Sequence, residues 1–131
     1  MGRRILIIDD EHIILELLAI IFCKEGYEVD AASNGAGGLK MAYSREYDII
    51  ISDIDMPVMS GIEFYRKLIE KIPSMKQRVL FITGNDDMET FMFLNETGVK
   101  YLLKPFKPMD IVKAVTEVGD FTNSKTSRFS G

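Results

Sequence analysis

Residues 5–10 read Ile-Leu-Ile-Ile-Asp-Asp, an apolar run that ends in two acidic side chains. Three later apolar runs have the same form, and they end at Asp53, Thr83 and Lys104. A short continuous apolar run is typical of a strand that is buried on both faces, as in a parallel sheet. If these strands are parallel, the polar residues at their ends lie together at the carboxyl edge, where open α/β sheets place their chemistry. The pattern therefore predicts a functional site at one edge of the sheet.

Segments with a helical spacing of apolar side chains separate these strands. Strands that alternate with helices of about 10–15 residues favour right-handed βαβ units, with helices on both faces of a parallel sheet. The segment 27–31 adds a second, short strand. We expect helices at residues 11–25, 36–45, 62–72, 86–96 and 108–118. These patterns predict one α/β domain and leave the order of its strands open.

The composition is that of a single globular domain. The chain has 131 residues, 47% of them apolar, and a net charge of −4. This charge, without a basic stripe, argues against direct nucleic-acid binding. No apolar run reaches the roughly 20 residues of a membrane span, and no signal peptide is visible. The single cysteine, Cys23, excludes an internal disulfide. We therefore expect a cytoplasmic domain that binds neither nucleic acid nor membranes directly.

The polar residues at the predicted edge suit phosphoryl chemistry. Asp9 and Asp10 would repel each other if they were buried without a cation, and Asp53 adds a third carboxylate. Mg²⁺ suits such a cluster because it accepts carboxylates and keeps waters for an incoming phosphate; Mn²⁺ is a substitute. Asp53 is the candidate nucleophile, since a carboxylate can attack phosphorus. Lys104 would neutralise charge on the phosphoryl oxygens, and the Thr83 hydroxyl would donate to one of them.

Four motifs occur in order along the chain: Asp9-Asp10-Glu11, Asp53 with Met56-Pro57 and Gly61, Thr83-Gly84, and Lys104-Pro105-Phe106. This ordered set resembles the receiver domain of two-component response regulators. The match extends from residue 4 to about residue 119, so we assign residues 1–119 to this domain. Residues 120–131 are polar and read as a linker or an expression remnant. Gly98 lies only three residues before Tyr101, a spacing similar to that of receivers attached to hybrid histidine kinases.

The resemblance implies a fold and a function. The fold is a flavodoxin-like (βα)5 three-layer sandwich with strand order 2-1-3-4-5. The function is that of a phosphorelay switch, in which a histidine kinase or a phosphotransfer protein donates a phosphoryl group to form an aspartyl phosphate. Such a domain catalyses only its own phosphorylation and dephosphorylation, so we do not expect an enzyme.

The resemblance also implies a role for each matched residue. Asp53 would be the phosphoacceptor. The metal would be bound directly by Asp10, mainly through water by Asp9, and by the backbone carbonyl of Asp55. Lys104 would bridge the phosphoryl group and precede a cis peptide bond. Thr83 and Tyr101 would form the switch, and phosphorylation would change the face made by the helix at 86–96, the last strand and the last helix.

The helix predicted at residues 86–96 carries more apolar side chains than one buried stripe requires. Consecutive apolar positions point in every direction around a helix, so at least one of them faces solvent. We therefore expect an interaction face that includes Phe91, Phe93 and Tyr101, and that serves docking or homodimer formation. The alternative is that these are scattered exposed apolar side chains without a role.

Two other readings of the site remain open. Asp53-Ile54-Asp55 also resembles the Asp-x-Asp signature of haloacid-dehalogenase-type phosphatases. Against that reading, the signature lies on the third strand, no acidic pair follows Lys104, and Asp9 and Asp10 would have no role. The second reading is a degenerate receiver that acts as an unphosphorylated scaffold, which the complete set of acids disfavours.

Overall fold

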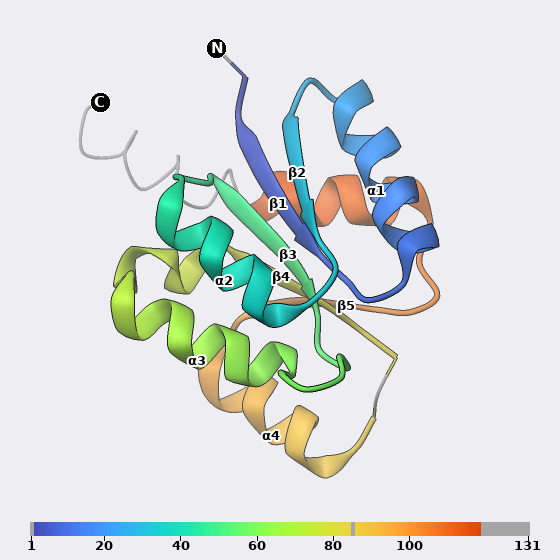
Figure 1. Ribbon diagram of the computed structural model, residues 1–131. Helices are drawn as coiled ribbons and strands as arrows, with labels where there is room; N and C mark the ends of the chain where they lie inside the picture. The colour runs from blue at the N-terminus through green and yellow to red at the C-terminus, as the bar shows by residue number, and fades with distance from the viewer. Residues whose placement is uncertain (1, 85, 119–131) are drawn as a thin grey trace, which may run out of the picture.

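The computed structural model describes residues 2–84 and 86–118. Five strands form one sheet in the order β2-β1-β3-β4-β5, and each neighbouring pair is parallel. Figure 1 shows this twisted sheet between two layers of helices. The strand order and the layered α/β architecture that the resemblance implied are confirmed. The strands are β1 (Arg4–Ile8), β2 (Glu28–Ala32), β3 (Ile49–Asp53), β4 (Val79–Thr83) and β5 (Lys100–Leu103).

Helices cover both faces of the sheet. Helix α1 and the last helix, residues 108–118, pack on one face; α2, α3 and α4 pack on the other (Figure 1). The predicted helices are all present, with ends that differ by one or two residues. The bounds are α1 (His12–Lys24), α2 (Gly35–Ser44), α3 (Gly61–Lys71), the 3₁₀ turn η1 (Pro73–Gln77) and α4 (Met88–Thr97).

Successive residues of each central strand serve different cores. In β1, Ile5 and Ile7 pack beneath α1 and the last helix, whereas Leu6 and Ile8 pack beneath α2 and α3. Neighbouring side chains of a strand point to opposite faces, so a strand that is covered on both sides must be apolar at every position. This is the physical reason for the continuous apolar runs in the sequence. It also holds the strand ends rigidly at one edge.

Helix α4 begins later than predicted, and its orientation corrects one expectation. Asp87 caps its first turn by accepting a hydrogen bond from the Thr90 N–H at 2.8 Å. Phe93 is only 3% exposed, because its ring packs edge-to-face against Tyr65 and Phe81, with ring centroids 5.6 Å apart in each case. The prediction that Phe93 belongs to the exposed face is therefore wrong. Phe91, in contrast, is 62% exposed.

The predicted tail, residues 120–131, lies outside the described residues. Among residues 2–84 and 86–118, every helix is too short or too polar to cross a membrane.

Candidate functional site

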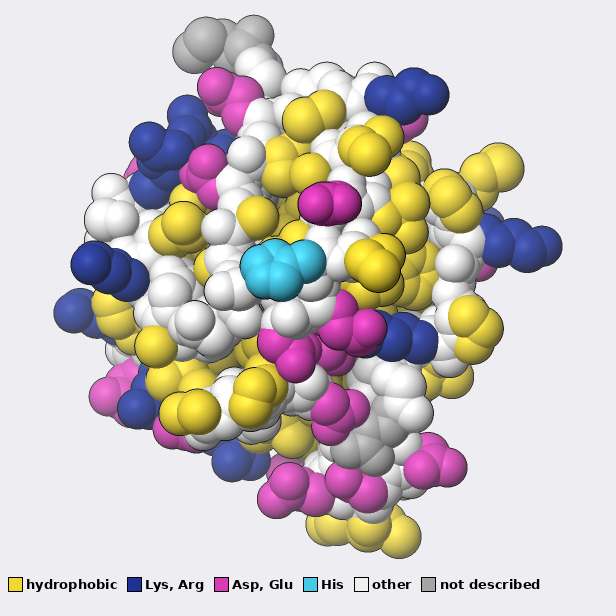
Figure 2. All heavy atoms as spheres, turned by 45° about the vertical axis from the view of Figure 1, so that its right-hand side comes forward, with side chains coloured by type: hydrophobic (Ala, Val, Ile, Leu, Met, Phe, Trp, Pro, Cys, Tyr) yellow, Lys and Arg dark blue, Asp and Glu magenta, His cyan; other side chains and the backbone are white. Residues whose placement is uncertain are grey.

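The carboxyl edge of the sheet collects the predicted polar residues. Asp9 directly follows β1, Asp53 ends β3, Thr83 ends β4 and Lys104 directly follows β5. Asp53 is opposite Ile82 in the β3–β4 ladder, and the Lys104 N–H donates to the Thr83 carbonyl at 2.9 Å. The register of the strands therefore positions these side chains. Figure 2 shows acidic side chains gathered on this face, with a basic side chain beside them.

Three carboxylates form a compact oxygen cluster. One oxygen each from Asp9, Asp10 and Asp53 lies within 4.8 Å of the others; Asp9 and Asp53 are buried and Asp10 is exposed. Asp9 Oδ1 accepts a hydrogen bond from the Glu11 N–H at 2.9 Å. Its Oδ2 is buried and accepts no hydrogen bond from the part of the chain that the structure describes.

A divalent cation fits this cluster. A buried carboxylate oxygen without a hydrogen bond is costly, and a bound cation would satisfy the Asp9 Oδ2 oxygen. Hard oxygen donors from one to three carboxylates are the set that Mg²⁺ accepts in proteins. The residues present therefore have the chemistry and the spacing that a magnesium site requires.

Lys104 places one ammonium group among three carboxylates. Its Nζ lies 3.4 Å from Asp53 Oδ2, 3.4 Å from Glu11 Oε1 and 3.8 Å from Asp9 Oδ2. The contacts with Asp53 and Glu11 also have hydrogen-bond geometry. Sequence reasoning assigned Lys104 to this site but gave no role to Glu11. The only signal for Glu11 was its position directly after the two acids, at the mouth of the site.

The site carries an excess of negative charge, and its pKa values reflect that excess. Burial, and then the neighbouring Asp9 carboxylate, raise the pKa of Asp53 to about 6, although Lys104 opposes the shift. Burial likewise raises the pKa of Asp9. Burial lowers the pKa of Lys104, but the Asp53, Asp9 and Glu11 carboxylates outweigh it and the net shift is upward. All three groups thus bind protons more tightly than usual.

The loop after β3 holds the Asp53 backbone and side chain. The Asp55 N–H donates to Asp53 Oδ1 at 3.3 Å, and the Gly61 N–H donates to the Ile54 carbonyl at 2.8 Å. A Cβ atom at Gly61 would collide with the Asp53 carbonyl oxygen and lie 2.8 Å from the Ile54 Cα. Glycine at this position therefore allows α3 to begin directly against the backbone of the acceptor residue.

The two predicted switch residues lie on either side of a small cavity. Thr83 is fully buried, whereas Tyr101 is 47% exposed. Both line a cavity of about 280 Å³ between α4 and β5, together with Phe91 and Leu94. The Lys104–Pro105 peptide bond is cis, as the resemblance predicts. Tyr101 is thus about half exposed, and its side chain lines the same cavity as Thr83.

Comparisons with known proteins agree with this geometry. The family model of the response regulator receiver domain matches residues 5–116. The chain is 33% identical over 120 residues to the chemotaxis protein CheY of Thermotoga maritima, covering 90% of this chain and 98% of that protein. It is also 33% identical over 119 residues to the transcriptional regulatory protein PhoP of Bacillus subtilis, covering 88% of this chain and 49% of PhoP. The chain thus spans about half the length of the transcriptional regulators that it matches.

Solved structures give the same result. A CheY-like receiver domain from Methanospirillum hungatei superposes with a TM-score of 0.88 at 31% identity, covering 95% of this chain and 99% of that chain. The response regulator TrrA of Thermotoga maritima, solved in complex with Mg²⁺ and BeF, superposes with a TM-score of 0.77 at 32% identity, covering 88% and 98%. Nothing in these comparisons supports the phosphatase alternative. The chain belongs to the response regulator receiver domain family, whose members are phosphoacceptors in two-component signalling.

Proposed function

We propose that this domain is a phosphorelay switch in which Asp53 accepts the phosphoryl group. The observation that carries the proposal is the position of Asp53, which is buried beside Asp9, within 3.4 Å of Lys104, and held by the Asp55 N–H. A carboxylate in this setting is oriented for attack, and Lys104 lies where negative charge on the transferring group develops.

The proposed reaction is an in-line displacement at phosphorus. An Asp53 carboxylate oxygen forms a bond to the phosphorus of a phosphohistidine, supplied by a histidine kinase or a phosphotransfer protein. The P–N bond breaks, and its electron pair stays on the imidazole nitrogen. Lys104 Nζ donates to a phosphoryl oxygen, and the Thr83 hydroxyl donates to another. The product is an aspartyl phosphate, which water later hydrolyses; the domain thus catalyses only its own modification.

Asp9, Asp10, Asp53 and the backbone carbonyl of Asp55 would hold Mg²⁺, or Mn²⁺ in its place. When bound, the ion supplies charge neutralisation for the phosphoryl oxygens. The support for this assignment is the three-carboxylate cluster and the unsatisfied oxygen of Asp9.

Phosphorylation would shift an equilibrium between two arrangements of Thr83 and Tyr101 around the cavity that they line. A phosphoryl group on Asp53 attracts the Thr83 hydroxyl, and the Tyr101 ring then moves into the vacated space. This movement would change the face formed by α4, β5 and the last helix. The support for the proposal is that the half-exposed Tyr101 and the buried Thr83 line one cavity between α4 and β5.

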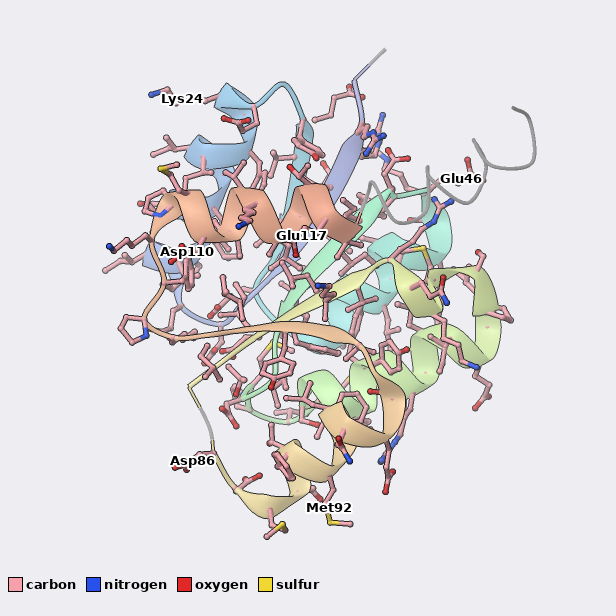
Figure 3. The ribbon with its side chains drawn as sticks, turned by 180° about the vertical axis from the view of Figure 1, so that it is seen from behind. Lys24, Glu46, Asp86, Met92, Asp110 and Glu117 are labelled. Carbon is pink, nitrogen blue, oxygen red and sulfur yellow. The ribbon has the colours of Figure 1, made fainter. Side chains whose placement is uncertain are left out.

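Acetyl phosphate labelling tests the proposed function. With Mg²⁺, the intact protein should gain one base-labile phosphoryl group, measured by mass spectrometry, and the gain should be small without Mg²⁺. Asp53→Asn should abolish it, whereas Asp110→Asn, at an exposed acid on the last helix (Figure 3), should label normally. Continuous turnover of a phosphomonoester would instead indicate a phosphatase, and an unlabelled wild-type protein would indicate a scaffold.

We also propose that phosphorylated copies pair through the outer surface of α4. Met88, Phe91 and Met92 are exposed there, next to Tyr101, and Met92 points away from the sheet in Figure 3. Light scattering with Mg²⁺ and beryllofluoride should detect a dimer, and Phe91→Glu should prevent it. Ile20→Glu is the matched control, because Ile20 on α1 is as exposed as Phe91. A monomer under all conditions, or equal effects of both variants, would contradict the proposal.

We also propose the bounds of the domain, its cellular location and its subtype. Residues 1–119 form the receiver domain and residues 120–131 a tail, although the family model itself matches residues 5–116. The protein acts in the cytoplasm, where its phosphodonor is available. The short spacing from Gly98 to Tyr101 supports an assignment to the receivers attached to hybrid histidine kinases.

A further inference from the structure

Glu11 is the exposed member of the carboxylate set around Lys104. Its carboxylate lies 3.4 Å from Lys104 Nζ, the same distance as Asp53, although its side chain is 62% exposed. Asp9 and Asp53 contact Lys104 from the buried side of the site, at exposures of 1% and 4%. Lys104 is therefore held between a buried pair of acids and an acid at the mouth.

This arrangement conflicts with what an incoming phosphoryl group requires. Three carboxylates, from Asp9, Glu11 and Asp53, contact a single ammonium group, so the oxygens of an incoming phosphoryl group compete with them for its donors. The phosphoryl group gains from Lys104 only if Nζ, which already contacts Asp53, gives up other partners and donates to the new oxygens. A lysine presents three donors on a flexible stem, and every donor that Glu11 engages is one fewer for the phosphoryl group.

We propose that Glu11 is a positioning residue that restrains Lys104 in the unphosphorylated domain and thereby slows phosphorylation of Asp53. The inference rests on the proposed function of Asp53 and names a regulator of the same site. Glu11 acts by competition: its carboxylate and the phosphoryl oxygens require the same ammonium group. Because Glu11 is exposed, its hold on Lys104 is weak enough for a phosphodonor to displace it.

Two substitutions separate this competition from a simple charge effect. Glu11→Gln removes the charge at nearly constant shape. Glu11→Asp keeps the charge but shortens the side chain, so that the carboxylate no longer reaches Lys104. If Glu11 restrains Lys104, both variants should label faster than the wild type with acetyl phosphate and Mg²⁺. We expect about a two- to fivefold increase in the second-order rate constant, the rate equivalent of losing an exposed ion pair.

The controls address net charge and the route through Lys104. Glu25→Gln removes an exposed acid at the opposite end of α1 from Glu11, and this variant should label at the wild-type rate. The ¹⁵N resonance of the Lys104 ammonium should shift in both Glu11 variants and stay unchanged in Glu25→Gln. A merely structural role for Glu11 would not move that signal.

Each outcome decides the matter. Wild-type protein that takes up no phosphoryl group refutes the proposed function itself. If the wild type is labelled but Glu11→Gln labels no faster, only the role of Glu11 is refuted. A faster Glu11→Gln beside an unchanged Glu11→Asp would show that the charge of Glu11 repels the donor, without restraint of Lys104, and would also overturn the inference.

Discussion

At the scale of single residues, the carboxylate of Asp53 illustrates a conflict between stability and function. The group is buried beside Asp9, and its pKa is raised from 3.8 to about 6. A buried acid with a raised pKa destabilises the folded protein wherever it is ionised, that is, above its folded pKa. Proteins commonly retain such costly groups at functional sites, because the same burial and charge prepare them for chemistry.

Asp53→Asn should therefore stabilise the protein in the absence of divalent cations. The wild type gains stability as the pH falls from 6 toward 4, because the folded state then takes up a proton that the unfolded state does not. The variant lacks the part of this dependence that Asp53 contributes, while the raised pKa of Asp9 still contributes its own part. Its advantage should be about 1–3 kcal/mol at pH 7.5 and largely lost at pH 4. Urea denaturation at both pH values measures this, with Glu16→Gln, at an exposed acid on α1, as the control. An equal free energy of unfolding for Asp53→Asn and wild type at pH 7.5 would refute the argument.

Val58 provides a second prediction at this scale. It lies in the loop between β3 and α3 with φ at 70°, and it is fully exposed. A β-branched residue is strained in this left-handed region, whereas asparagine tolerates it. Val58→Asn should raise the free energy of unfolding by about 0.5–1 kcal/mol. Val58→Thr, which is more polar but still β-branched, should give no such gain in thermal denaturation; equal gains would assign the effect to polarity.

At the scale of elements, the start of α3 determines where the acceptor residue sits. Ser60 caps the helix by accepting a hydrogen bond from the Glu63 N–H at 3.2 Å, and Gly61 then begins the helix against the Asp53 backbone. The loop between β3 and α3 is short, and hydrogen bonds from the Asp55 and Gly61 N–H groups hold its two ends. A movement of the first turn of α3 is therefore transmitted directly to the end of β3.

Gly61→Ala should both destabilise the protein and slow its labelling. The new Cβ meets backbone atoms of Asp53 and Ile54, which yield only if the loop shifts. We expect a loss of about 1–3 kcal/mol, typical of overpacking, and slower uptake of phosphoryl groups from acetyl phosphate. For stability the control is Gly84→Ala, whose Cβ would make only an ordinary contact with the Lys104 side chain at 3.7 Å. If both alanine variants unfold alike, the close approach at Gly61 is unimportant.

At the scale of the whole molecule, two cores on opposite faces of one sheet hold the strand ends in register. The larger cluster, beneath α2, α3 and α4, includes a group of three rings from Tyr65, Phe81 and Phe93. This group joins α3, β4 and α4. It anchors α4 beside the Thr83 cavity while leaving the outer surface of the helix free.

A pair of substitutions in α4 tests that placement. Phe93→Ala removes a buried ring and should cost about 3–5 kcal/mol of unfolding free energy. Phe91→Ala removes an exposed ring two residues earlier and should change stability by less than about 1 kcal/mol. Thermal and urea denaturation measure both. Similar losses for the two variants would mean that α4 is rotated relative to the orientation described here.

Sequence patterns are enough to predict the fold class and the residues that form the site. Strands covered on both faces must be continuously apolar, and the carboxyl ends of parallel strands share one edge. The sequence therefore predicts that Asp9, Asp53, Thr83 and Lys104 share one site. The strand order came from the resemblance to a family, because apolar runs of similar composition do not specify which strands are neighbours.

The orientation of α4 and the contact between Glu11 and Lys104 depend on three-dimensional packing. Residues 91–94 are all apolar, so the sequence does not show which of them faces the core. Packing against Tyr65 and Phe81 buries Phe93 and leaves Phe91 exposed. The contact between Glu11 and Lys104 joins residues 93 positions apart. It exists because β1 and β5 end at the same edge of the sheet, so that the side chains of Glu11 and Lys104, which follow those strands, meet beyond the ends of β3 and β4. A linear sequence does not contain this proximity.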